Sequence, residues 1–111
     1  MKLLWADINA SYSHSNLAFP AMEAQMPPSL RAECEWEVVG GTLKSPQEEL
    51  VMKIANFKPQ YIFATAWLFN IEYLLSVIEK SVILLPGTKV ILGGPEFLGD
   101  NSDFLLKHPF V

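Results

Sequence analysis

The sequence predicts an α/β domain built on a parallel sheet, and two observations lead to this prediction. Short apolar runs of strand length alternate along the chain with longer segments whose apolar residues recur at helical spacing. Glycine, proline and asparagine separate the two kinds of segment. Because consecutive parallel strands need a crossover between them, this alternation predicts parallel strands joined by right-handed helical crossovers.

The first part of the chain predicts two strands. Residues 2–8, KLLWADI, form an apolar run that ends in a polar loop, as expected for a buried strand. A helix is expected over about residues 17–25, and Pro27 and Pro28 either end it or begin a new turn. Residues 34–40, CEWEVVG, predict a second strand nearer the edge of the sheet, with its glutamates facing water.

The next segment, SPQEELVMKIANF, has a helix start signal. Ser45 stands as the expected N-cap, Pro46 occupies the first helical position, and Glu48 completes a capping box. The apolar residues that then recur on one face are Leu50, Ile54 and Phe57. This pattern predicts an amphipathic helix.

The second half of the chain predicts a third strand and a long helix. Residues 60–67, QYIFATAW, are apolar, which is typical of a strand covered on both faces. Asn70 is expected to cap the helix over residues 71–85, which ends at the pair Pro86 and Gly87.

The last part of the chain predicts a fourth strand and a short helix. Residues 89–94, KVILGG, form the strand, and residues 101–108 form the helix, with Asn101 or Ser102 as its cap. The final PFV resembles the approach to a fifth strand. We therefore expect the chain to be the front piece of a longer protein.

The composition of the chain excludes several classes of function. A chain of 111 residues, half of them hydrophobic, suits a single globular domain. The net charge of −4 has the wrong sign for a protein that neutralises nucleic-acid phosphates. Charged residues interrupt the long apolar segments, and Asp7 comes too early for a secretory signal. We expect a cytoplasmic protein with no nucleic-acid or membrane partner.

Three loops are expected at the carboxyl ends of the strands, where open parallel sheets bind ligands. They cover residues 9–16, which are polar, residues 66–70, which are aromatic, and residues 93–100, which begin with paired glycines. The first loop lacks the glycines of a dinucleotide site, and the third strand lacks the aspartate of a phospho-receiver. The loops instead favour a large, partly apolar ligand held by a few polar contacts.

Several segments carry a resemblance to a known family. DINASYSHSNLA, WLFNIEYLLSVI and VILGGPEFLGDN, with the later LLKHPFV, resemble the N-terminal cobalamin (vitamin B12)-binding domain of B12-binding radical S-adenosylmethionine (SAM) proteins. The resemblance spans nearly the whole chain. It implies a three-layer flavodoxin-like or Rossmann-like parallel sheet with strand order 2-1-3-4(-5), in which the fifth strand is truncated.

The resemblance also implies the role of the chain. Residues 1–111 would be one cobalamin-binding domain that presents the cofactor to a C-terminal radical SAM barrel. SAM and a 4Fe-4S iron-sulfur cluster would belong to that barrel, because this chain has no matching cysteine motif. By itself the chain is expected to have no catalytic residues.

The resemblance further indicates which residues hold cobalamin. Thr65 matches a hydroxyl residue that can hydrogen-bond the nucleotide tail, and Gly93 and Gly94 match a glycine pair that leaves room for it. The other candidates, taken from the three loops, are Asn9, Ser11, Tyr12, His14, Ser15, Asn16, Ala66, Trp67, Pro95 and Glu96.

The sequence departs from the D-x-H-x-x-G motif, in which the histidine coordinates cobalt. Asn9 stands in place of that histidine and Tyr12 in place of the glycine, so we expect no metal-ligating side chain. This departure keeps an alternative open, a structural or docking domain whose groove is filled by Tyr12, Trp67 and Phe97. A flavin carrier is a weaker alternative. An exposed strand edge would also favour self-association of the isolated piece.

Overall fold

The computed structural model describes residues 1–9, 24–66, 70–94 and 101–111. Its elements, in chain order, are β1 (Lys2–Asn9), α2 (Pro28–Glu33), β2 (Glu35–Thr42), α3 (Gln47–Phe57), β3 (Tyr61–Thr65), α4 (Ile71–Leu84), β4 (Lys89–Gly93) and α5 (Ser102–Lys107). The predicted alternation of strands and helices is confirmed. The helix expected at residues 17–25 falls mostly outside the described residues.

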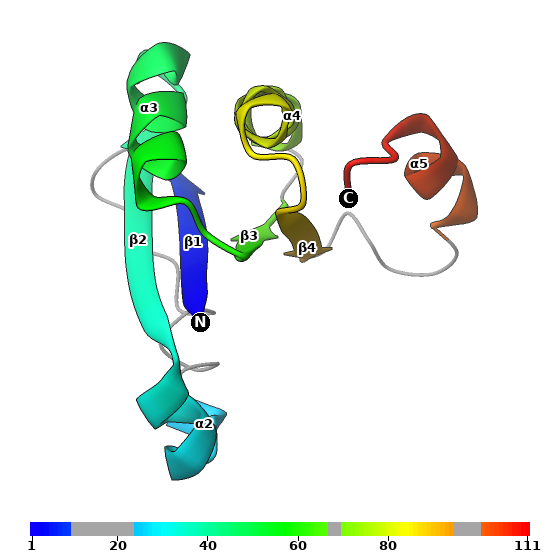
Figure 1. The fold of residues 1–111 in the computed structure, drawn as a ribbon. Helices are drawn as coiled ribbons and strands as arrows, with labels where there is room; N and C mark the ends of the chain where they lie inside the picture. The colour runs from blue at the N-terminus through cyan, green and yellow to red at the C-terminus, as the bar shows by residue number, and fades with distance from the viewer. Residues whose placement is uncertain (10–23, 67–69, 95–100) are drawn as a thin grey trace.

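The four strands form one sheet with the order β2-β1-β3-β4 (Figure 1). All neighbouring strands are parallel. The α/β fold class, the parallel direction and the strand order are those predicted. As expected, β2 lies at an edge, and its residues Glu35 and Glu37 are exposed.

Helices α3 and α4 lie on the same face of the sheet and build the main core against it (Figure 1). The side chains that contribute alternate along the strands, as the pleat of a strand requires. The buried residues of this core are Leu4, Ala6, Ile8, Val39, Leu50, Val51, Ile54, Ile62, Ala64, Ala66, Leu74, Val77, Ile78 and Val90. Full burial of one such aliphatic side chain stabilises the fold by about 1.5–3 kcal/mol.

The opposite face of the sheet carries an aromatic cluster, which we define as Trp5, Trp36, Tyr61 and Phe63. Phe63 is at its centre, with ring centroids 6.4 Å from Trp5, 5.5 Å from Trp36 and 6.3 Å from Tyr61. Trp5 is buried, as expected for the buried strand predicted over residues 2–8. The aromatic cluster is therefore a second apolar layer that faces away from α3 and α4.

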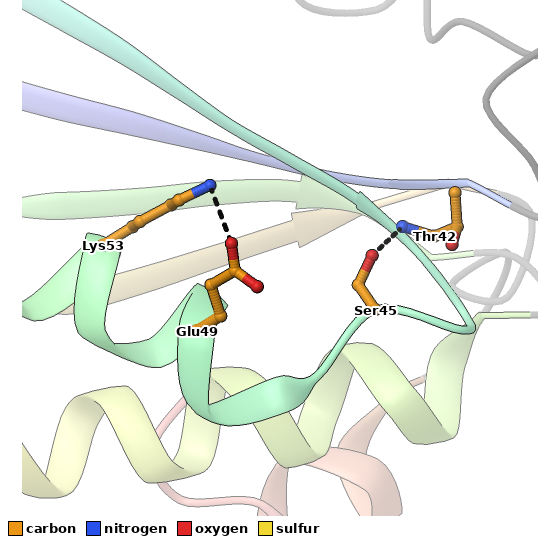
Figure 2. Close-up of polar contacts among 4 residues, drawn as sticks. All are labelled: Thr42, Ser45, Glu49 and Lys53. Atoms are coloured by element: carbon orange, nitrogen blue, oxygen red, sulfur yellow. Dashed lines mark hydrogen bonds and ion pairs between the residues drawn. The ribbon is translucent and has the colours of Figure 1, made fainter.

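The predicted capping box of α3 is wrong. The helix begins at Gln47, and Pro46 occupies the N-cap position without a side-chain cap. The hydroxyl oxygen Oγ of Ser45 instead accepts a hydrogen bond of 3.0 Å from the amide of Thr42 (Figure 2). The physical reason is a tight turn after β2, in which the Ser45 amide also donates to the Thr42 carbonyl.

The remaining element ends follow simple rules. Helical residues 24–25 end before Pro27, and Pro28 opens α2, so both expectations for the proline pair are met. Strand β2 continues to Thr42, beyond its predicted end at residue 40. Asn70 occupies the N-cap position of α4 but makes no side-chain cap. Within the described residues, no helix is long and apolar enough to cross a membrane.

Candidate functional site

The candidate site lies where β1, β3 and β4 end at the same edge of the sheet. Strand β1 ends at Asn9, and Thr65, the last residue of β3, pairs with Gly93, the last residue of β4. Ala66 and Gly94 follow directly. The candidates that lie outside the described residues are Ser11, Tyr12, His14, Ser15, Asn16, Trp67, Pro95 and Glu96.

Thr65 and Gly93 are neighbours on the face of the aromatic cluster. Along β3 the buried residues Ile62 and Ala64 face the helices, so the half-buried Thr65 shares the other face with Phe63. A Cβ atom added to Gly93 would meet no heavy atom of the described residues within 4 Å. The Thr65–Gly93 pair therefore places a hydroxyl beside an open position.

Gly94 has a different role from Gly93. Its φ angle is +108°, and an added Cβ would lie 2.5 Å from the carbonyl oxygen of Ala66 and 3.0 Å from its amide nitrogen. Such an approach is possible only for a residue that lacks a side chain. The amide of Ala66 also donates a hydrogen bond of 2.7 Å to the carbonyl of Gly93. Gly94 is thus required by the close packing of the β3 and β4 ends.

Ala66 is placed away from the open position. Its side chain is fully buried and belongs to the core beneath α3 and α4. Its contribution to the site is its backbone, which joins the ends of β3 and β4 through the hydrogen bond to Gly93. The open face at the strand ends is therefore formed by Thr65 and Gly93 rather than by the Ala66 side chain.

Asp7 extends this face toward β1. It pairs with Gly40 of β2, and it follows Ala6, which pairs with Ala64 of β3. Asp7 and Thr65 are therefore each one residue beyond the Ala6–Ala64 pair, on the same face of the sheet. The row that crosses the sheet is Gly40, Asp7, Thr65 and Gly93, with a half-buried carboxylate and a hydroxyl between two glycines.

Asn70 was expected only to cap α4 and was not among the candidate site residues, and the predicted side-chain cap is wrong. Its side chain, 2% exposed, donates hydrogen bonds from Nδ2 to the carbonyl of Ile8 at 3.0 Å and to the carbonyl of Thr65 at 3.2 Å. One partner is 62 positions away in the sequence. An asparagine before a helix is usually a cap, so no local signal identifies this link.

No protein-family model matches the sequence, and a search of curated proteins finds no match. Among the residues that the structure describes, no group of three or more His, Cys, Asp or Glu side chains could hold a metal ion.

Three hollows lined by described residues lie away from the carboxyl edge. One of about 620 Å³ lies at the amino ends of β3 and β4, beside Lys58 and Lys89. Another of about 450 Å³ lies between β2 and α3. A third of about 550 Å³ lies between β4 and the C-terminal residues Pro109–Val111. Thr65 and Gly93 line none of these three hollows, whereas Gly40 of the same row lines the second.

Proposed function

We propose that this chain is a cobalamin-binding module that positions its cofactor for a radical SAM domain on the same polypeptide. The chemistry would be supplied by the cofactor, and the module would supply binding and orientation. The observation that supports the proposal best is the Thr65–Gly93 pair. It joins a hydrogen-bonding hydroxyl to a position where the missing side chain leaves space.

The fit to cobalamin follows from the order of residues along this face. The nucleotide tail would cross the sheet at Gly93, where any larger side chain would stand in its way. The Thr65 hydroxyl would donate to or accept from the tail. The carboxylate of Asp7, in the same row, would add a hydrogen-bond acceptor. The polar contacts are few, as is usual for a large and partly apolar ligand.

Exposed apolar side chains that flank the aromatic cluster would contact an apolar part of the same ligand. Phe63 lies two residues before Thr65 in β3, and Trp5 lies two residues before Asp7 in β1, so all four are on the same face of the sheet. At the two sides of this row, Val38 pairs with Trp5 and is 44% exposed, and Ile91 pairs with Phe63 and is 47% exposed. Trp5 itself is buried, so the apolar side chains that are exposed beside the polar row are Val38 and Ile91, and these would contact the apolar parts of cobalamin.

Hydroxocobalamin binding, followed by visible absorption during equilibrium dialysis, tests the proposal. We expect saturable binding to the unmodified chain and a loss of at least about tenfold in affinity for Gly93→Leu, because the new side chain fills the open position. Lys89→Leu is the matched control, since it adds a leucine to the same strand and the same face at the opposite end. Equal losses in the two variants would contradict the assigned position.

The alternative is a docking domain of the same class that has lost its cofactor. Asn9, which ends β1 where a cobalt-ligating histidine would stand, is the observation that favours it. A chain that is shown to be folded by circular dichroism, yet binds no hydroxocobalamin at millimolar concentration, would support this alternative and reject the cofactor role.

A further inference from the structure

The side chain of Asn70 joins the ends of the two central strands at the candidate site. Its Nδ2 atom donates to the carbonyl of Ile8 in β1 and to the carbonyl of Thr65 in β3. The side chain is buried, so these hydrogen bonds are protected from competition with water. A single amide therefore fixes two strand ends relative to each other.

The peptide group between Thr65 and Ala66 is consequently held by a hydrogen bond at each of its two polar atoms. The Thr65 carbonyl accepts from Asn70, and the amide of the next residue, Ala66, donates to Gly93. The other partner of Asn70 is the carbonyl of Ile8, directly before Asn9, where the first candidate loop begins. The Asn70 side chain thus links the end of β1 to the Thr65–Gly93 pair.

We propose that Asn70 is a positioning residue for the ligand site at the carboxyl edge. This inference rests on the proposed function for its ligand, but its structural part can be tested without one. The residue acts through the Ile8 and Thr65 carbonyls, whose placement sets the Thr65 hydroxyl and the start of the first loop. A role in positioning requires the donor groups of the amide, which an aspartate at the same place lacks when it is ionised.

Helix capping is the competing explanation, and the two roles predict opposite results for one substitution. The Asn70 side chain makes no cap hydrogen bond. The main-chain carbonyl of Asn70 accepts a hydrogen bond of 2.8 Å from the Leu74 amide at the start of α4. Aspartate caps helices as well as asparagine and is favoured by the helix dipole. Asn70→Asp would therefore be harmless to a cap but would set a carboxylate against two carbonyl oxygens.

Amide hydrogen exchange on the ligand-free chain tests the structural part. In Asn70→Asp and the milder Asn70→Ala, we expect exchange of the Ala66 amide to accelerate by at least about tenfold, as for the loss of one or two hydrogen bonds. The Lys89 amide, which donates to Gln60 at the other end of the sheet, is expected to change much less. Leu74→Ala is the control, because it removes buried side-chain packing from the same helix and leaves the Asn70 side chain in place.

Hydroxocobalamin affinity, measured at a temperature where every variant is folded, tests the ligand part. We expect both Asn70 variants to bind at least about tenfold more weakly than Leu74→Ala, because the contact geometry is lost rather than global stability. Equal acceleration of the Ala66 and Lys89 amides in Asn70→Asp, as in the control, would overturn the positioning role. If the unmodified chain binds no cobalamin but the Ala66 effect is local, the proposed function fails and the structural role of Asn70 stands.

Discussion

The two adjacent glycines at the end of β4 are expected to respond in opposite ways to alanine. In Gly94→Ala, the new Cβ must be accommodated at a φ of +108° and at 2.5 Å from the carbonyl oxygen of Ala66. The backbone conformation costs about 1–2 kcal/mol. Moving the β3 end away from the new atom costs about another 1–3 kcal/mol. We therefore expect a loss of about 2–5 kcal/mol in the free energy of unfolding, from a total of roughly 5–15 kcal/mol for a domain of this size.

Gly93→Ala is the matched control, because its Cβ would meet no described atom within 4 Å and its φ is not in the left-handed region. We expect its stability to remain within about 1 kcal/mol of the unmodified chain, with a gain if alanine restricts the unfolded state. Urea denaturation followed by circular dichroism measures the free energy of unfolding of both variants. The two can be compared directly when the dependence of that free energy on urea concentration is the same. Equal stabilities for the two variants would refute the assignment of Gly94 to strand packing.

Three further predictions concern stability and use the same urea assay. Asn70→Ala should lower the free energy of unfolding by about 2–4 kcal/mol, since it leaves two buried carbonyls without their donor; a loss below 0.5 kcal/mol would contradict the hydrogen bonds assigned to it. Leu74→Ala should cost about 2–5 kcal/mol, because Leu74 is fully buried, and a near-neutral result would argue against its place in the core. Lys53→Gln should change stability by less than about 0.5 kcal/mol, because the 3.7 Å pair with Glu49 (Figure 2) is more than half exposed; a larger loss would show an unrecognised role for Lys53.

The order of elements was predictable because hydrophobic period and turn residues act locally. Strand β3 is an apolar run and α3 repeats its apolar residues on one face, so both can be recognised from the local sequence, although β3 pairs with the distant strands β1 and β4. The strand order followed from a family resemblance, and the sheet confirms it. The Ser45 cap failed for a local reason as well. Its hydroxyl had two possible backbone partners, and the turn with Thr42 competed successfully with the helix.

The candidate site was predictable only in outline. Parallel strands bring their carboxyl ends to one edge, so the sequence could place Thr65 and the glycine pair together. The link from Asn70 to Ile8 joins residues 62 positions apart and leaves no local pattern. From the sequence, both glycines were expected to leave room for a ligand. The difference between them is that Gly94 has a positive φ and Gly93 does not, and this is a property of the folded backbone.

The different roles of Gly93 and Gly94 determine which glycine variant is informative about ligand binding. Gly94 is explained by its approach to the Ala66 backbone, so its presence is not evidence for a ligand. A side chain at Gly94 would disturb Ala66 and also Thr65 directly, because its Cβ would lie 2.9 Å from Cγ2 of Thr65, so a loss of cobalamin binding would have two explanations. Gly93 has no such packing requirement among the described residues. A side chain at Gly93 that preserves stability and abolishes binding would therefore leave occupation of the ligand's space as the remaining explanation.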